Sequence, residues 1–331
     1  MNLEETLKEK AKIFDKALSG NLASHEPKIA YDAIRWIPLS GGKRLRPIIT
    51  MLACEAVGGR PENAVSLGIA LEYIHNSTLV HDDIIDNDSW RRGLPTTHKK
   101  FGLPMAIIAG DGLIGETYRM LSYMAPPELK STTYKHIIRG IADAAKRFYE
   151  GEAMDIDFDT RNDVTIPEYM TMIEKKTAQL YWLAGKGGAL IGHGSKKQVE
   201  DLARYGVLFG VMFQLKDDLL NIVTDQAPLG KETLGSDIIN GKRTLLLVHA
   251  LNHATPQDKK TILHTLGNTK STPKDIQKTI TIFQHTNSIA FTQQKLKDYN
   301  TQAKQCLNSL KDSESKQILS ALADYSITRK Y

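Results

Sequence analysis

The sequence lacks the features that mark several specialised classes of protein. It has only two cysteines, Cys54 and Cys306, far apart and in helical contexts. We therefore expect neither a disulfide framework nor a zinc site, which fits a reducing cytosol. Residues 1–14 alternate charged with apolar residues, unlike a secretory signal peptide. No apolar run approaches the length of a membrane span, so any membrane contact would be peripheral. These absences predict a cytoplasmic protein.

A strong excess of one charge is missing as well. The formal net charge is +5 over 331 residues, with 41% hydrophobic and 24% charged residues. This excess is too mild to indicate a nucleic-acid partner, although it is compatible with anionic small substrates. We find no alternating strand pattern, no internal repeat and no low-complexity linker. The sequence therefore predicts one all-α domain over residues 1–331.

Helical periodicity is the pattern that the sequence does contain. Pro47 suits the first turn of one helix, and Gly58 suits its end. The glycine-rich stretch 185–188 matches no nucleotide-binding loop, so we expect it to serve close helix packing. The predicted helices are 3–18, 27–37, 48–57, 61–86, 105–124, 131–157, 166–194, 202–223 and 245–251, with helical spacing from Thr255 onward.

A cluster of three aspartates, Asp82, Asp83 and Asp86, ends the apolar helix 61–86. Asp82 and Asp86 project from one helix face, where mutual repulsion costs a few tenths of a kcal/mol unless a cation lies between them. Mg²⁺ suits two carboxylates together with the oxygens of a phosphorylated substrate. Taken alone, the cluster is equally compatible with a solvated helix end.

A second acidic pair, Asp217 and Asp218, lies near the end of another apolar helix. As a single feature it fits a solvated turn. Two such clusters facing each other across a helical bundle would hold several Mg²⁺ ions, and this pairing favours the metal interpretation.

Basic residues gather beside the same helix ends. Lys43, Arg44 and Arg46 follow two glycines and precede a helix N-terminus, where backbone N–H groups favour anions. Each basic residue alone is typical of a surface. Together with the carboxylates they predict a diphosphate site, to which we also assign Arg91, Arg92, Lys176, Lys231 and Lys242.

Five motifs occur in a fixed order: GGKRLRP, HDDIIDNDSWRRG, KKT, FQLKDD and GSDIINGKRT. From about Leu39 to Leu251 the chain resembles the trans-isoprenyl diphosphate synthases (polyprenyl synthases), most of all those that make geranylgeranyl diphosphate. The resemblance implies the isoprenoid synthase fold, a large helical bundle around a central apolar cavity. It also implies a homodimer that condenses isopentenyl diphosphate with dimethylallyl, geranyl or farnesyl diphosphate and releases diphosphate.

The resemblance assigns a role to each matched residue. Metal ligands for about three Mg²⁺ ions would be Asp82, Asp83, Asp86, Asp217 and Asp218. The allylic diphosphate would be bound by Arg91, Lys176, Lys231 and Lys242. Isopentenyl diphosphate would be bound by Lys43, Arg46, His75 and Arg92. Thr177 and Gln214 would lie near the developing allylic cation.

The chain departs from the family pattern at position 221. The second motif usually ends in aspartate there, and this chain has Asn221. Asparagine is neutral and a weaker metal ligand than a carboxylate. We expect Asp217 to provide most of the coordination at the second cluster, and activity to survive the change.

Product length depends in this family on the side chains just before the first aspartates. Ser77 and Thr78 are small, whereas short-chain synthases tend to carry aromatic rings here. Ile74, and further away Tyr118 and Met120, would then act deeper in the cavity. We therefore predict geranylgeranyl diphosphate as the product, with longer polyprenyl chains as the alternative.

Three competing interpretations fit less of the sequence. A class I terpene cyclase has little need of a second diphosphate pocket, so GGKRLRP argues against it. A non-catalytic subunit of a heteromeric synthase would be expected to have lost its aspartates. A nucleic-acid-binding module would carry its basic residues in a stripe with interleaved aromatics, not beside carboxylates.

Overall fold

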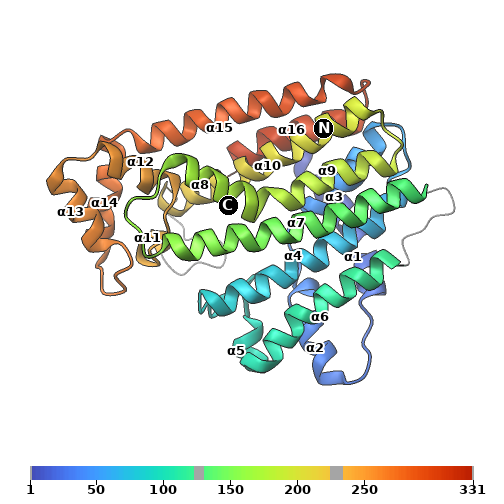
Figure 1. Ribbon diagram of the computed structural model, residues 1–331, viewed down its shortest axis with the longest axis horizontal. Helices are drawn as coiled ribbons and strands as arrows, with labels where there is room; N and C mark the ends of the chain where they lie inside the picture. Colours follow the sequence, from blue (N-terminus) through green and yellow to red (C-terminus); the bar gives the residue numbers. More distant parts are fainter. Residues whose placement is uncertain (1, 123–129, 224–233, 330–331) are drawn as a thin grey trace. The chain divides into compact units, whose positions relative to one another are not determined.

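Helices make up nearly all of the regular structure (Figure 1). The computed structural model describes residues 2–122, 130–223 and 234–329. Within these ranges the regular elements are helices, with one short hairpin as the exception. The predicted all-α class is confirmed. Among the described residues, no helix is both long and apolar enough to cross a membrane.

Contacts divide the chain into two compact units. The first unit comprises Met1–Ala145, Leu180–Gly206 and Cys306–Leu322. The second comprises Lys146–Gln179, Val207–Gln305 and Ala323–Tyr331. The prediction of one domain over the whole chain stays a prediction.

The first unit is centred on α4, which packs along α6 and beside α3. It holds all or most of eight helices: α1 (Leu3–Asn21), α2 (Lys28–Trp36), α3 (Leu45–Ala56), α4 (Val65–Ile85), α5 (Thr97–Phe101), α6 (Leu103–Ser122), α9 (Gln179–Ile191) and α16 (Glu314–Thr328). The first parts of α7 (Ser131–Phe158) and α10 (Lys196–Val223) also belong to it. Its 3₁₀ turns are Pro38–Ser40, Pro61–Ala64 and Cys306–Ser309.

Helix α4 is buried on nearly every side. Its apolar residues are spread around the helix, and Leu67, Leu71 and Ile74 are buried with most of their neighbours, including polar ones such as Glu72 and Asn76. The helix begins at Val65, four residues after the predicted start, because Pro61–Ala64 forms a 3₁₀ turn instead. This single element therefore fixes the relative positions of the histidine, small and acidic residues that the sequence assigned to substrate and metal.

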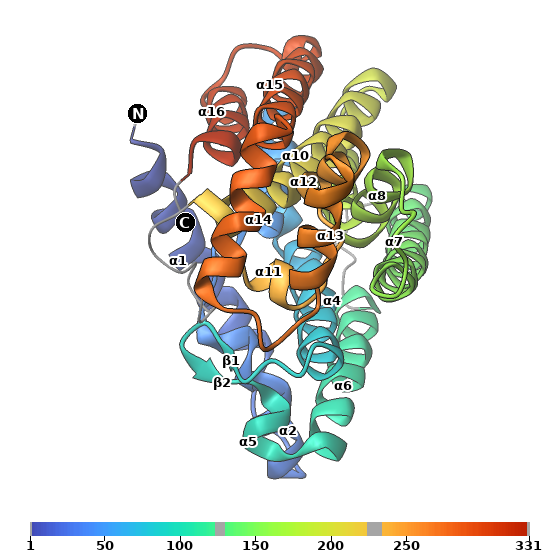
Figure 2. The same ribbon diagram turned by 90° about the vertical axis from the view of Figure 1, so that its left-hand side faces the viewer.

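One hairpin was not expected. Strands β1 (Trp90–Arg91) and β2 (Leu94–Pro95) pair antiparallel directly after α4, and lead into α5 (Figure 2). The two turn residues, Arg92 and Gly93, both have positive φ, of 53° and 76°, as a two-residue hairpin turn requires. Strands of two residues are too short to show an alternating pattern, so the periodicity of the sequence did not indicate this hairpin.

The second unit surrounds α8 (Ile166–Ile173) and a π-helical turn that continues it, Glu174–Ala178. A capping box of Thr165 and Glu168 starts α8. The unit also contains α11 (Ser236–Ile239), α12 (Leu245–His253), α13 (Pro256–Thr265), α14 (Pro273–His285), α15 (Ser288–Gln305) and the last halves of α7 and α10.

The glycine-rich stretch of α9 serves close packing inside the first unit, as predicted. A Cβ atom at Gly188 would lie 2.2 Å from the carbonyl oxygen of Thr50, and one at Gly185 would lie 2.1 Å from that of Leu202. Neither distance is possible for a real side chain. Glycine at these positions therefore sets how closely α9 approaches α3 and α10.

We predict that Gly188→Ala lowers the free energy of unfolding by about 1–3 kcal/mol, because α9 must move away from Thr50. Urea denaturation measures the change. Gly20→Ala is the matched control, since nothing lies within 4 Å of a Cβ atom there. Equal stability of the two variants would contradict the close approach of α9.

Candidate active site

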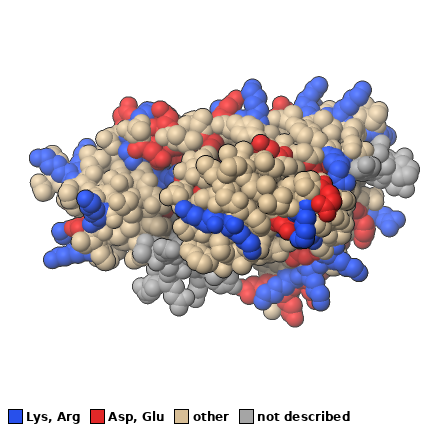
Figure 3. All heavy atoms as spheres, turned by 90° about the horizontal axis from the view of Figure 1, so that it is seen from below, with Lys and Arg blue, Asp and Glu red and all other residues tan. Residues whose placement is uncertain are grey.

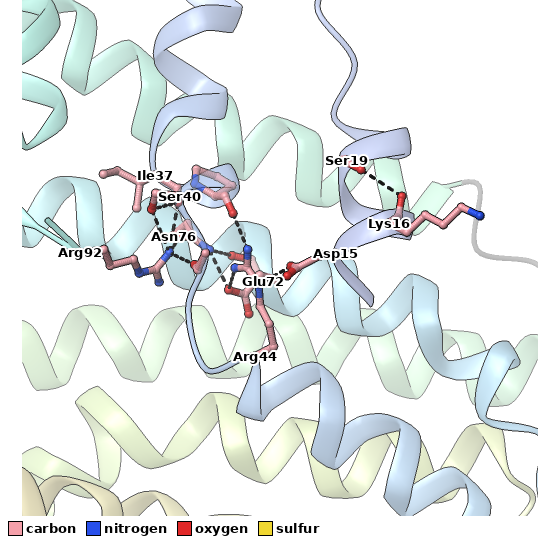
Figure 4. A network of polar contacts seen from close by, with 11 residues as sticks. Asp15, Lys16, Ser19, Ile37, Ser40, Arg44, Glu72, Asn76 and Arg92 are labelled. Atoms are coloured by element: carbon pink, nitrogen blue, oxygen red, sulfur yellow. Dashed lines mark hydrogen bonds and ion pairs between the residues drawn. The ribbon is translucent and has the colours of Figure 1, made fainter. Parts of the chain in front are cut away.

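The first unit assembles the basic residues that the sequence assigned to isopentenyl diphosphate. Arg92, in the hairpin turn, donates from Nη1 to the carbonyl oxygens of Gly41 at 2.5 Å and Ile37 at 3.1 Å, and to Asn76 Oδ1 at 3.4 Å (Figure 4). These bonds tie the loop before α3 to α4. His75 lies one residue before Asn76 on α4.

The three basic residues of this loop have different environments. Arg44 is buried and donates to Glu72 Oε1 at 2.6 Å, to Asp15 Oδ1 at 2.7 Å and to the carbonyl oxygen of Pro38 (Figure 4). Its charge is therefore neutralised within the protein. Lys43 is exposed, and Arg46 lies half-buried with its guanidinium 4.3 Å from the ring centre of Tyr181. Arg46 Nε has no hydrogen-bond partner among the described residues.

His75 is neutral at neutral pH. Burial, followed by the positive charges of Arg46, Arg92, Arg91 and Arg44, lowers the pKa of His75 well below its usual value. Four arginines are thus near enough for their charges to act on the imidazole. The structure thus brings together Arg46, His75 and Arg92, three of the four residues predicted for this substrate, with Lys43 on the adjoining loop.

The first aspartate cluster lies at the C-terminal end of α4. Asp83 is fully buried, Asp82 is half-buried and Asp86 is exposed. Arg91 Nε donates to Asp83 Oδ1 at 2.5 Å, whereas Asp83 Oδ2 accepts no hydrogen bond from any described residue. Burial raises the pKa of Asp83 to about 6, an effect that outweighs the lowering by Arg91. A buried acceptor-only oxygen of this kind is suited to a cation.

The residues predicted to set product length lie one to two turns before the aspartates. Ser77 and Thr78 are buried, and their hydroxyls donate to carbonyl oxygens of their own helix, both at 2.8 Å. Ile74 and Met120 are buried too, whereas Tyr118 is 57% exposed. Neither of these two positions on α4 therefore carries an aromatic ring.

The second unit contains a pocket of its own. It gathers the predicted residues Lys176, Thr177, Gln214, Asp217, Asp218 and Lys242, together with Asp155, Tyr169, Met172, Ile173, Asp237, Arg243 and Thr244. The predicted residue Lys231 lies outside the described part of the chain.

The π-helical turn positions the KKT motif against α7. A Cβ atom at Gly151 would lie 2.4 Å from the backbone nitrogen of Lys176, so α7 approaches the turn closely. Lys176 Nζ lies 2.7 Å from both Glu152 Oε2 and Asp155 Oδ2, and Lys242 Nζ lies 3.3 Å from Asp155 Oδ2. Burial raises the pKa of Asp155, but the two lysines outweigh it and hold this pKa below its usual value. Asp155 thus holds together two lysines assigned to diphosphate.

Sequence reasoning missed this pair of carboxylates on α7. Glu152 and Asp155 have the i, i+3 spacing of one helix face, which is the only signal that the sequence offered. It does not reveal that their partners come from Lys176 and Lys242.

Asp218 accepts hydrogen bonds at both carboxylate oxygens. Tyr169 donates to Oδ2 at 2.5 Å and Gln214 Nε2 to Oδ1 at 3.0 Å, while Thr177 donates to Gln214 Oε1 at 3.0 Å. Burial, and then the charge of Asp218, raises the pKa of Tyr169 well above its usual value, so the phenol stays a donor. Tyr169 was missed because an aromatic residue in an apolar helix is typical of a core.

Asp217 has a different environment. Its side chain is 43% exposed, and Arg329 Nη2 lies 2.7 Å from its Oδ1. Arg329 also lies over the ring of Phe213, 4.1 Å from its centre. No motif in the sequence pointed to Arg329, which follows Asp217 by more than a hundred residues.

A family model described as polyprenyl synthetase matches residues 27–283. The geranylgeranyl diphosphate synthase of Methanosarcina mazei is 35% identical over 331 residues, covering 100% of this chain and 99% of that protein. The chain belongs to the polyprenyl synthetase family.

Solved structures agree with this membership. The geranylgeranyl pyrophosphate synthetase of Pyrococcus horikoshii has a TM-score of 0.93 and 35% identity, covering 99% of this chain and 98% of that one. The geranylgeranyl pyrophosphate synthase of Corynebacterium glutamicum, solved with isoprenyl diphosphate and magnesium, has a TM-score of 0.85 and 27% identity, covering 99% and 98%. The predicted isoprenoid synthase fold and the predicted trans-prenyltransferase class are confirmed, and the roles of individual residues stay predictions.

The departure from the polyprenyl synthetase pattern at position 221 has a structural explanation. Asn221 is buried, its Nδ2 donates to Ser236 Oγ at 2.8 Å, and its Oδ1 accepts from the backbone nitrogen of Asp237 at 3.1 Å. Its own carbonyl oxygen accepts from Gly235 N. The amide thus fixes the start of α11 and brings Asp237 to the pocket.

We predict that Asn221→Ala loosens residues 235–241, because Asp237 N–H and Ser236 Oγ lose their partner, at a cost of about 1–3 kcal/mol. Hydrogen–deuterium exchange of this segment measures the effect. Asn162→Ala is the control, since that amide contacts Arg243 by a single bond at 3.2 Å. Unchanged exchange at 235–241 in Asn221→Ala would contradict the assignment.

Proposed function

We propose that this protein condenses isopentenyl diphosphate with dimethylallyl, geranyl and farnesyl diphosphates, with geranylgeranyl diphosphate as its final product. The observation that carries the proposal is the composition of α4 and its neighbours. One helix bears His75 among arginines, and two turns later the carboxylates of Asp82 and Asp83. A basic loop tied to α4 by Arg92, and a carboxylate cluster at the end of the same helix, suit a substrate whose diphosphate is neutralised by metal.

Mg²⁺ is the proposed cofactor, at about three ions, with Asp82, Asp83, Asp86 and Asp217 as ligands. The donor set consists of carboxylate oxygens, the ligands that Mg²⁺ prefers, and the orphaned Asp83 Oδ2 fits such a cation. When bound, the metal supplies positive charge that stabilises the departing diphosphate. Asp218 was predicted as a ligand too, but its two hydrogen-bonded oxygens suggest a different task.

The protein's own residues provide the remaining steps. Lys43, Arg46, His75 and Arg92 bind the head group of isopentenyl diphosphate and orient its alkene. Arg91, Lys176, Lys231 and Lys242 bind the allylic diphosphate, which breaks its C–O bond as charge develops on both halves. The alkene then attacks the allylic cation, and proton loss to the released diphosphate restores a double bond. Thr177 and Gln214 supply oxygen lone pairs near the cation.

A homodimer is part of the proposal. In the first unit, α6 exposes Leu103, Ile107 and Ile108, each at 45–51% of its surface. Apolar side chains gathered on one helix support association with a second copy. Sedimentation equilibrium of the purified protein tests this. The cytoplasmic location stays a prediction.

Two alternatives from the sequence find little support. A non-catalytic subunit has no need of carboxylates held as Asp83 and Asp155 are, each buried and facing cationic groups. A nucleic-acid-binding protein would show a basic stripe. On the face that Figure 3 shows, the described Lys and Arg residues are mixed with Asp and Glu.

The deciding experiment incubates purified protein, Mg²⁺, labelled isopentenyl diphosphate and each allylic primer, and resolves the products by chain length. We expect C20 products, and a loss of at least about 100-fold in rate for Asp217→Ala at saturating Mg²⁺. Asp312→Ala, which removes a fully exposed carboxylate, is the control. No condensation by the wild-type protein would overturn the enzyme, and accumulation of longer chains would favour a longer-chain synthase.

We predict that Mg²⁺ affinity falls below about pH 6, by up to about tenfold per pH unit, because a proton on Asp83 competes with the metal. The raised pKa means that the carboxylate is ionised and ready for metal above pH 6. Calorimetric titration of Mg²⁺ from pH 5 to pH 7.5 measures the affinity. Asp83→Asn should remove the step near pH 6, whereas Asp86→Asn, at an exposed position, should keep it.

Ser77→Phe should shorten the product to C15 or less, because a ring replaces a buried small side chain one turn before the aspartates. Product analysis by chain length measures this. Ser77→Ala is the matched control, since it removes the hydroxyl without adding bulk, and it should leave the product length unchanged. A C20 product from Ser77→Phe would place the floor of the cavity elsewhere.

A further inference from the structure

Four side chains of the second unit form one continuous line of hydrogen bonds. The line runs from the Tyr169 hydroxyl to Asp218 Oδ2, from Gln214 Nε2 to Asp218 Oδ1, and from the Thr177 hydroxyl to Gln214 Oε1. The bonds are 2.5, 3.0 and 3.0 Å long. Tyr169 and Asp218 are 1% and 4% exposed, and all four residues line the same pocket.

The carboxylate fixes the direction of every bond in this line. An ionised carboxylate can only accept, so Gln214 must turn its NH₂ group toward Asp218 and its carbonyl oxygen toward Thr177. The single hydroxyl proton of Thr177 then points to Gln214. The orientation of this amide follows from chemistry, because the opposite one would place two acceptors in contact.

As a consequence, Gln214 and Thr177 present only hydrogen-bond acceptors to the pocket. Gln214 Oε1 and Thr177 Oγ1 each keep a lone pair for the pocket, and neither presents a proton to it. If the amide were reversed, an N–H group would take the place of Oε1, and the hydroxyl hydrogen of Thr177 would no longer have Gln214 as its acceptor. Positive ends of dipoles would then face the pocket, where they would oppose a developing cation.

We propose that Tyr169 and Asp218 are positioning residues that lock the Gln214 amide in the orientation that stabilises the allylic cation. This inference rests on the proposed function, in which Thr177 and Gln214 face that cation. It assigns Asp218 to the amide and not to the metal. Tyr169 acts by holding the second carboxylate oxygen, so that Asp218 keeps one position relative to Gln214.

Exchanging the carboxylate and the amide between positions 218 and 214 tests the proposal. Asp218→Asn alone removes the fixed polarity, because the new amide can turn either its oxygen or its NH₂ group toward Gln214 while the Tyr169 hydroxyl donates or accepts accordingly, so the Gln214 amide is no longer held in one orientation. Gln214→Glu alone places two carboxylates in contact. In the double variant, the amide at position 218 donates to the carboxylate at position 214, and Thr177 again donates to position 214. The three hydrogen bonds of the line are restored, and the negative charge is kept but moves from position 218 to position 214.

We expect each single variant to lose about tenfold or more in kcat, as loss of an orienting partner does elsewhere. The double variant should recover to within about threefold of wild type, with KM for isopentenyl diphosphate unchanged throughout. A double variant no more active than the worse single variant would overturn the proposal, because a carboxylate needed at position 218 as a metal ligand cannot be replaced from position 214.

Tyr169→Phe provides a second, independent measurement. We expect about a tenfold lower kcat with the same half-saturating Mg²⁺ concentration. Tyr205→Phe is matched, because that phenol is also fully buried and donates one bond, to the carbonyl oxygen of Leu319 at 2.7 Å. It should lose stability alone and keep its kcat.

The outcomes separate the proposal from the proposed function. A raised Mg²⁺ requirement with full activity at saturating metal in Tyr169→Phe would show that the line serves a metal ligand, and would overturn the inference. Wild-type kcat in Tyr169→Phe would overturn it too. If that variant does not fold, the exchange between positions 218 and 214 decides alone. Absence of condensation by the wild-type protein instead removes the function on which the inference rests.

Discussion

Buried carboxylates set the strongest constraint on this protein. An ionised carboxylate has only acceptors, so a buried one is stable only beside donors or cations. Asp155 meets this need with Lys176 and Lys242, and Asp218 with Tyr169 and Gln214. Asp83 meets it at one oxygen only, through Arg91. The raised pKa of Asp83 is the direct result, and the same deficit makes this carboxylate ready for a metal ion.

The basic loop before α3 shows the converse case, in which a buried arginine must lie beside carboxylate or carbonyl acceptors. Arg44, Glu72 and Asn76 form a buried network that also reaches Arg92, and the loop is fixed by it (Figure 4). Breaking one partner of such a buried ion pair typically costs about 3–5 kcal/mol. Arg44 is thus committed to structure, whereas Arg46 Nε, at the start of α3, has no hydrogen-bond partner among the described residues.

Much of this could be predicted from the sequence, for physical reasons. Apolar periodicity is local, so α4 was predicted to within four residues at its start and α10 with its observed end, and the motifs contain most of the residues that line the pocket. Contacts over long sequence separations could not be predicted. Arg329 and Asp217 are far apart in the sequence and meet only in the folded chain, and the same holds for Tyr169 and Asp218. The hairpin at residues 90–95 was missed because two residues per strand carry no periodic signal.

In the second acidic motif, residues with the spacing of metal ligands have different environments in the structure. Asp217, Asp218 and position 221 share the i, i+1, i+4 spacing of the first cluster, which suggests three equivalent ligands. The structure gives them three environments: Asp217 is half-exposed, Asp218 is buried with its oxygens hydrogen-bonded, and Asn221 holds the start of α11. A carboxylate at 221 would lack the N–H donor that Ser236 Oγ receives. It would also add a negative charge at a fully buried position of α10. The neutral amide therefore suits this chain, because it can donate to Ser236 and accept from Asp237 N–H at the same time.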